Sequence, residues 1–124
     1  MVEGSKYRPI DLNELKEIMD DDEELAKECL TDFIKIFPGM LTNIKITIDK
    51  RDPAGLDQAA HKLKGTLKYV GAFHAAEKAH ELEIMGKQKD LRQVAGPYEA
   101  LKEECDRVKA FILNYCEEGL EFTI

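Results

Sequence analysis

Three side chains in the middle of the chain combine a nucleophile with positive charge. His61, Lys64 and Lys68 follow one another at intervals of three and four residues, which places them on one side of a helix. Ammonium groups beside an imidazole disfavour its protonated form, and a neutral imidazole is a nucleophile near pH 7. The same ammonium groups would stabilise an anionic group, such as a phosphoryl group, once the histidine carried it. By themselves the lysines could equally form an ordinary solvated helix face. Together with the imidazole, the spacing also fits nucleophilic transfer of an anionic group.

A histidine nucleophile also needs its second ring nitrogen held in place, and Glu83 is the candidate for this task. A carboxylate that accepts a hydrogen bond from Nδ1–H fixes the tautomer in which the Nε2 lone pair faces outward. Glu83 directly follows Leu82, which the helical pattern places inward, so the carboxylate should flank a helix–helix seam. His80 lies one turn earlier. By position alone, Glu83 and His80 could equally be ordinary surface residues, as we expect for His74.

The helix that would carry His61 has an apolar stripe, formed by Leu56, Ala60, Leu63, Leu67 and Val70. On a wheel of about 100° per residue, His61 lies roughly 140° from the centre of this stripe and Gly65 roughly 180° from it. Glycine in a helix interior costs about 0.5–1 kcal/mol relative to alanine. Because an outward glycine gains nothing from core packing, the predicted use of Gly65 is clearance for a molecule that approaches His61.

The residues before this helix predict further helices. Asp11 can cap a short helix that reaches Met19, and a second helix runs from Glu23 to about Phe37. Pro38-Gly39 should break or kink the second helix. The alternation of apolar residues over 44–48 is typical of a strand, but no second strand exists to pair with it. We therefore expect helix over about 39–51.

Strong boundary signals surround the His61 helix. Asp52-Pro53 predicts an N-cap followed by proline at the first helical position, and Gly71 is placed to take a left-handed conformation after the end. Another helix should span about 73–87. The last helix should start at Asp90 or be delayed to Pro97 by Gly96-Pro97, continue to about Glu117 and end at Gly119. These elements predict an all-α fold, an antiparallel four-helix bundle with a short extra N-terminal helix.

Composition limits the function classes. The 124 residues fit one domain over 1–124, with its core at about 10–117, and the net charge of −7 argues against nucleic acid as a partner. No apolar run approaches the roughly 18–20 residues of a membrane span, and the N-terminus lacks the apolar region of a signal peptide. Three cysteines without a C-x-x-C motif predict reduced thiols in a cytoplasmic protein. The solvated outer faces favour a monomer.

The run His61-Lys62-Leu63-Lys64-Gly65 resembles the signature H-x-[LI]-K-G of the histidine-containing phosphotransfer (HPt) domains of two-component relays. Gly71 lies ten residues after His61 and Glu83 twenty-two after it, the offsets at which this family has a glycine and an acidic or amide residue. The resemblance covers about residues 10–117. It implies that His61 is the phosphoacceptor, Lys64 the cation near the phosphoryl group, Gly65 the clearance for a partner, and Glu83 the Nδ1 acceptor. The expected partner-binding residues are Asp57, Gln58, Lys62, Gly65 and Lys68.

Two features depart from the usual relay pattern. Many relay members carry glutamine where this chain has Glu83, and glutamate with His80 three residues earlier looks more like the phosphoacceptor domain of chemotaxis-type kinases. Small residues are usual after the motif glycine, whereas this chain continues Thr66-Leu67-Lys68-Tyr69, a difference that would alter the fit to a partner.

The resemblance implies a phosphocarrier that exchanges phosphoryl groups with aspartates of response-regulator receiver domains, in a pathway that includes a histidine kinase. The chain has no nucleotide-binding glycine-rich loop, so we expect no autokinase activity, no cofactor and no metal ion of its own. A metal site from His61, His80 and Glu83 would leave the lysines unexplained. Two alternatives stay open: a phosphoacceptor module of a larger kinase, against which a native reading frame ending near Ile124 would count, and an adaptor that binds a receiver without transfer.

Overall fold

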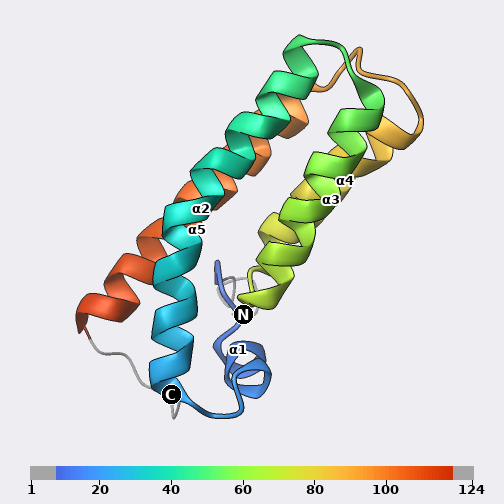
Figure 1. Cartoon of the computed structure of the whole chain (residues 1–124). Helices are drawn as coiled ribbons and strands as arrows, with labels where there is room; N and C mark the ends of the chain where they lie inside the picture. The colour runs from blue at the N-terminus through green and yellow to red at the C-terminus, as the bar shows by residue number, and fades with distance from the viewer. Residues whose placement is uncertain (1–7, 119–124) are drawn as a thin grey trace, which may run out of the picture.

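The structure is a computed structural model that describes residues 8–118, with side chains as far as residue 116. Within that range it contains five helices and no strand: α1 (Leu12–Ile18), α2 (Glu23–Asp49), α3 (Pro53–Tyr69), α4 (Phe73–Lys87) and α5 (Ala95–Glu118). Helices α2 to α5 form a bundle, and α1 lies across one end of it (Figure 1). The predicted fold class is confirmed.

The four bundle helices differ in length, and α1 fills the space at the end that the shorter helices do not reach. Helix α2 has 27 residues and α3 has 17, lengths of about 40 and 25 Å at 1.5 Å per residue. The α3–α4 pair therefore stops short of the end of α2, and α1 occupies that end (Figure 1). The backbone N–H of Asp11 donates to the carbonyl of Gly71 at 2.9 Å, which ties the start of α1 to the α3–α4 turn.

Local signals at the helix ends act as the sequence predicts. The Asp11 and Asp52 carboxylates accept hydrogen bonds from the first turns of α1 and α3. The structure adds a third cap of this kind, because the Asp22 carboxylate does the same for α2. Pro53 is the first residue of α3. Gly71 follows the end of α3 with φ +79°, and an added Cβ would lie 3.1 Å from the Asp11 carbonyl oxygen, so both conformation and space require glycine here.

The predicted break at Pro38-Gly39 is wrong. Helix α2 continues through Pro38, so the two helices expected at 23–37 and 39–51 are one. Proline inside a helix removes one backbone hydrogen bond and costs roughly 3 kcal/mol. Buried side chains on both sides of Pro38, among them Phe33, Phe37, Leu41 and Ile44, lie on the same face of α2 and hold both halves against the bundle. Their burial outweighs the cost of the proline.

The last helix starts near the later of the two predicted positions. Helix α5 begins at Ala95, and Pro97 lies within its first turn, where no intrahelical hydrogen bond is lost. Asp90 does not cap this helix. Its carboxylate instead accepts hydrogen bonds from the backbone and guanidinium of Arg92 in the α4–α5 connection. The predicted end at Gly119 lies outside the described residues.

One hydrophobic core runs through the bundle and includes α1. Its largest fully buried side chains include Leu15, Phe33, Leu56, Leu63, Leu82, Leu101 and Tyr115. All three cysteines are free thiols, and burial raises the pKa of Cys105 to about 12, so this thiol stays protonated. None of the helices between residues 8 and 118 is both long enough and apolar enough to cross a membrane.

Candidate functional site

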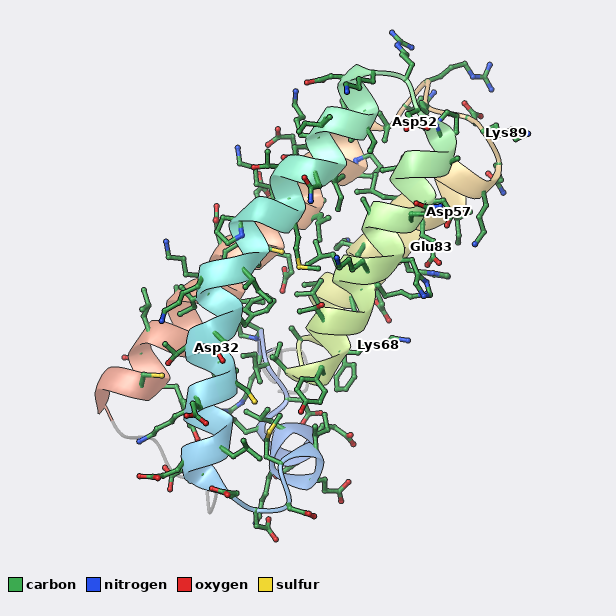
Figure 2. The ribbon with its side chains drawn as sticks, viewed as in Figure 1. Asp32, Asp52, Asp57, Lys68, Glu83 and Lys89 are labelled. Carbon is green, nitrogen blue, oxygen red and sulfur yellow. The ribbon has the colours of Figure 1, made fainter. Side chains whose placement is uncertain are left out.

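Helices α3 and α4 approach each other closely at Gly86. A Cβ added there would lie 2.7 Å from the backbone nitrogen of Asp57 and 2.7 Å from the carbonyl oxygen of Pro53. Only a residue without a side chain lets the two backbones pack at this distance. The close approach sets the register in which the preceding turn of α4, which carries Glu83, faces the part of α3 that carries His61. Figure 2 labels Asp57 on α3 and Glu83 on α4.

Glu83 is the centre of a hydrogen-bonded cluster between the two helices. Its side chain is only 4% exposed. Oε2 lies 2.7 Å from Nδ1 of His61, and Oε1 accepts a hydrogen bond from Nζ of Lys64 at 2.7 Å. Nδ1 of His80 lies 3.1 Å from the same Oε1. The four residues that the sequence singled out for chemistry therefore meet at one buried carboxylate.

The ionisation of Glu83 fixes the tautomers of both imidazoles. Burial of the carboxyl group acts to raise its pKa, but the hydrogen bonds from Lys64, His80 and His61 together outweigh burial and lower the pKa to about 2. An ionised carboxylate can only accept hydrogen bonds. Each Nδ1 must therefore carry the proton, and in the neutral ring the lone pair is on Nε2.

The His61 ring faces outward with its Nε2 available. The side chain is 68% exposed, while its Nδ1 edge is held against the buried carboxylate. Gly65, one turn further along α3, is exposed, and no atom lies within 4 Å of an added Cβ. Both residues point away from the core, as the helical wheel predicts. This face of α3 can accommodate a partner that approaches the imidazole closely.

Lys64 is less exposed than the sequence alone suggests. Its side chain is 18% exposed and its ammonium group is paired with Glu83. The stem crosses the α3–α4 seam, so its charge lies beside the imidazole but is already balanced by a carboxylate. The basic patch around His61 therefore consists of one paired ammonium group together with the exposed Lys62 and Lys68.

Lys87 belongs to the cluster, although the sequence analysis did not single it out. Its Nζ lies 3.1 Å from Oδ1 of Asp57 and 3.8 Å from Oε2 of Glu83. A signal was present in the sequence: Lys87 is four residues after Glu83, a spacing that places both on one side of a helix. Its pairing with Asp57, on α3, depends on the packing of two helices.

The five residues expected to bind a partner fall into two groups. Gln58, Lys62, Gly65 and Lys68 are exposed, whereas Asp57 is half-buried and paired with Lys87. Beside Lys68 the surface has a hollow of about 260 Å³, lined by Lys64, Lys68, Phe73, Ala76, Glu77 and His80. The hollow adjoins the cluster on the side of His80.

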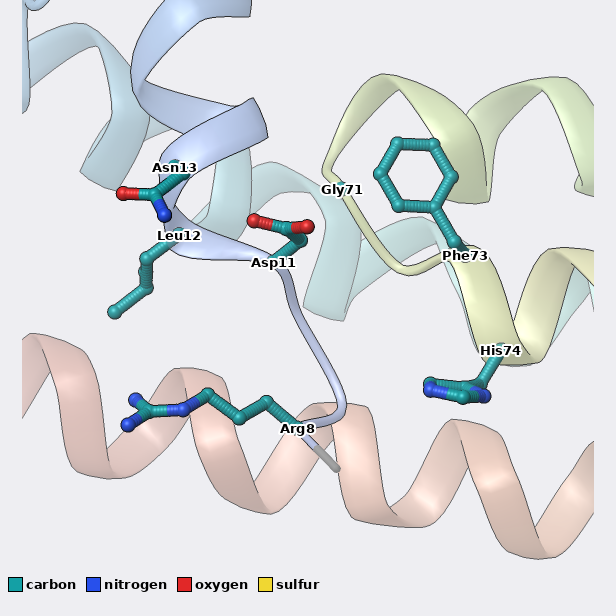
Figure 3. A pocket seen from close by; sticks show the side chains of 7 residues that line it. All are labelled: Arg8, Asp11, Leu12, Asn13, Gly71, Phe73 and His74. Atoms are coloured by element: carbon teal, nitrogen blue, oxygen red, sulfur yellow. The ribbon is translucent and has the colours of Figure 1, made fainter. Parts of the chain in front are cut away.

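A second hollow lies at the α1 end of the bundle, away from the cluster. Its volume is about 370 Å³, and Figure 3 shows the seven residues that line it: Arg8, Asp11, Leu12, Asn13, Gly71, Phe73 and His74. None of them contacts His61, Glu83 or Lys64 through the hydrogen bonds and ion pairs described above. We therefore assign this hollow no part in the chemistry of His61.

His61, His80 and Glu83 lie close together, but their contacts are hydrogen bonds. Among residues 8–118, no group of three or more histidine, cysteine, aspartate or glutamate side chains is arranged to hold a metal ion. Both imidazoles present their protonated Nδ1 edge to Glu83, so these atoms are hydrogen-bond donors rather than ligands.

Comparison with known protein families identifies a family whose model covers most of this chain. The family model described as Hpt domain matches residues 15–111, a range that includes α2, α3, α4 and most of α5. Neither the search of curated proteins nor the search of solved structures gave a significant match.

Proposed function

This chain belongs to the Hpt domain family, whose members carry out histidine phosphotransfer in phosphorelays, and we propose that it relays phosphoryl groups between receiver domains through Nε2 of His61. The observation that carries this proposal is the 2.7 Å contact between His61 Nδ1 and a buried carboxylate. It supports an imidazole that is oriented by its Nδ1 edge and is open to a partner at Nε2.

The proposed step conserves atoms and charge. The Nε2 lone pair of His61 attacks the phosphorus of an aspartyl phosphate on a receiver domain. The Nε2–P bond forms as the acyl P–O bond breaks, and the bonding electrons leave with the aspartate carboxylate. The ring keeps its Nδ1 proton and becomes cationic, and Glu83 stabilises that charge through the existing hydrogen bond. The reverse sequence delivers the group to a second receiver.

The main contribution of this chain to the transfer is to hold the His61 ring and the surrounding charges in position. A loose phosphoryl-transfer transition state needs alignment of donor and acceptor and stabilisation of charge on the transferred group. We assign Lys64 the role of a cation near that group and Gly65 the role of clearance for the receiver. Gln58, Lys62 and Lys68 surround His61 with polar and positive groups that complement an acidic receiver pocket. The Mg²⁺ ion that such transfers use belongs, in this proposal, to the receiver.

The test is label transfer from a phosphorylated receiver domain to this chain. The wild type should acquire label, and His61→Gln should acquire none. His74→Gln is a matched control, because it removes another exposed histidine outside the cluster. Transfer to His61→Gln at the wild-type rate would refute the assignment of His61, whatever the fold.

A second candidate role is that of the phosphoacceptor module of a histidine kinase. The 3.1 Å contact between His80 and Glu83 favours it, because this combination resembles the modules of chemotaxis-type kinases. In that role His61 would take its phosphoryl group from ATP bound to a kinase catalytic domain. Loading by a purified kinase but by no phosphorylated receiver would favour this role over that of a relay carrier.

A role as an adaptor without transfer is the remaining alternative. It predicts that a His61→Ala variant retains full biological activity, whereas a carrier loses it.

We also propose that the exchange takes place in the cytoplasm, where receivers and kinase domains would meet the chain. The three free thiols support a reducing compartment.

A further inference from the structure

Lys87 occupies a position between two carboxylates. Its Nζ lies 3.1 and 3.3 Å from the two carboxylate oxygens of Asp57, on α3 one turn before His61. It also lies 3.8 Å from Oε2 of Glu83, the oxygen that holds Nδ1 of His61. One carboxylate oxygen thus separates this ammonium group from the imidazole.

The Lys87 ammonium group can leave its present partner at little cost. The side chain is 57% exposed, and ion pairs at such solvated positions contribute little to stability. The stem has four carbons with free rotation, so the group can move several ångströms without any shift of the backbone. Lys64 differs in both respects, because it is largely covered and its partner Glu83 is buried.

Phosphorylation of His61 would change the balance of charges around Lys87. A phosphoryl group carries a charge of about −1.5 to −2 near pH 7, more than a single carboxylate. The charged and titratable groups around it would be Asp57, Lys62, Lys64 and Lys68 on α3 and His80, Glu83 and Lys87 on α4. Lys64 and Lys87 are the lysines that pair with a carboxylate of the cluster, and of these two Lys87 is the more exposed and is held by the more exposed carboxylate.

We propose that Lys87 is a phosphoryl-sensing residue that Asp57 holds in reserve: Lys87 pairs with Asp57 while His61 is unmodified and turns to the phosphoryl oxygens when His61 is phosphorylated. This inference rests on the proposed function of His61. Asp57 competes with the phosphoryl group for one ammonium group, so the two residues have opposite effects on phosphohistidine. Lys87 stabilises the dianionic phosphoryl group, and Asp57 opposes that stabilisation.

The opposite signs make the proposal testable by phosphorus NMR. The full chain is loaded with phosphoramidate, a small donor whose P–N bond breaks with release of ammonia. The ³¹P chemical shift of the phosphohistidine is then followed from about pH 6 to about pH 10, which covers the second ionisation of a phosphoryl group. Lys87→Gln should raise the phosphoryl pKa by roughly half a unit, and Asp57→Asn should lower it by a similar amount.

Two variants on α5 control for net charge. Lys102→Gln and Asp106→Asn change the charge of the chain by the same amounts at exposed positions on another helix, and both should leave the phosphoryl pKa unchanged. Lys87 and Asp57 could instead only brace α3 against α4. The charge removed by Asp57→Asn would then act directly on the phosphoryl group, so its pKa shift would be the same in the Lys87→Gln background as in the wild type. The proposal expects that shift to be lost in the Lys87→Gln background, and an unchanged shift would overturn it.

The same samples separate this proposal from that of the phosphoacceptor. If His61→Gln acquires the same ³¹P signal as the wild type, the assignment of His61 fails. If the signal requires His61 but does not respond to Lys87→Gln and Asp57→Asn with opposite signs, the phosphoacceptor stands and the role of Lys87 is refuted. Thermal unfolding of each variant confirms that the bundle is intact in the comparison.

Discussion

Nδ1 of His61 and Oε2 of Glu83 are 2.7 Å apart, although the two residues are separated by 22 positions and lie on different helices. Glu83 is almost completely buried, whereas the ring that it orients is mostly exposed. The buried partner fixes the direction of the exposed one, so the solvent-facing atom of the ring is the nitrogen that carries a lone pair. The Nδ1 edge of the ring is thus fixed by a buried group, while its Nε2 edge stays accessible.

Replacement of Glu83 should separate two effects of this residue on phosphotransfer: the orientation of the His61 ring and the negative charge of the carboxylate. Glu83→Gln keeps an oxygen that can accept from Nδ1–H but removes the negative charge, so transfer from a phosphorylated receiver should slow roughly tenfold. Glu83→Ala removes both and should slow transfer roughly 100-fold. The rates are measured by label transfer under single-turnover conditions. Equal rates in the wild type and Glu83→Ala would show that the hydrogen bond does not contribute to transfer.

Stability should depend on pH through Glu83. Its pKa is lowered from an ordinary 4.5 to about 2, so the folded state favours the ionised carboxylate more than the unfolded state does. The resulting stabilisation is fully present above about pH 5 and is lost as the pH falls towards 2. Between about pH 6 and about pH 3, urea unfolding should therefore show a larger loss of stability in the wild type than in Glu83→Gln, by up to a few kcal/mol. If the wild type and Glu83→Gln lost the same stability over this pH range, the lowered pKa of Glu83 would not contribute to folding.

Gly65 should be replaceable without loss of stability but with loss of docking. No atom lies within 4 Å of an added Cβ, and alanine is favoured over glycine in a helix by about 0.5–1 kcal/mol. Gly65→Ala should therefore keep or raise the free energy of unfolding. Gly65→Gln should fold equally well but weaken receiver binding roughly tenfold, because its side chain occupies the space beside His61. Calorimetric titration with a receiver measures the affinity, and an unchanged affinity would refute the clearance role.

Gly86 should behave in the opposite way. A Cβ at this position would overlap backbone atoms of Asp57 and Pro53, which cannot move aside as a flexible side chain could. Gly86→Ala should destabilise the fold by about 1–3 kcal/mol and slow phosphotransfer, because α4 must move away from α3. Gly39→Ala, in open space on α2, is the matched control and should stabilise the fold slightly. Urea unfolding measures both, and equal effects would contradict the close packing at Gly86.

Local chemistry explains which helix boundaries could be predicted. The caps at Asp11 and Asp52 and the left-handed glycine at Gly71 depend on hydrogen bonds within one turn, so the residues themselves carry the information. The continuation of α2 through Pro38 could not be predicted in this way, because the cost of the proline is local whereas the burial that offsets it comes from other helices. Asp90 does not cap α5, because Arg92 competes successfully for its carboxylate.

The sequence by itself determined the orientation of His61 and Gly65, because the apolar stripe of one helix defines which side faces the core. Together with the HPt signature, it also identified Lys64, Glu83 and His80 as candidate residues of the site around His61. Only the tertiary structure decided how these residues meet. The close approach at Gly86 sets the register of α4 against α3, and that register places one buried carboxylate among two imidazoles and two ammonium groups. The pairing of Lys87 with Asp57 follows from the same contact, because it joins residues that only helix packing brings together.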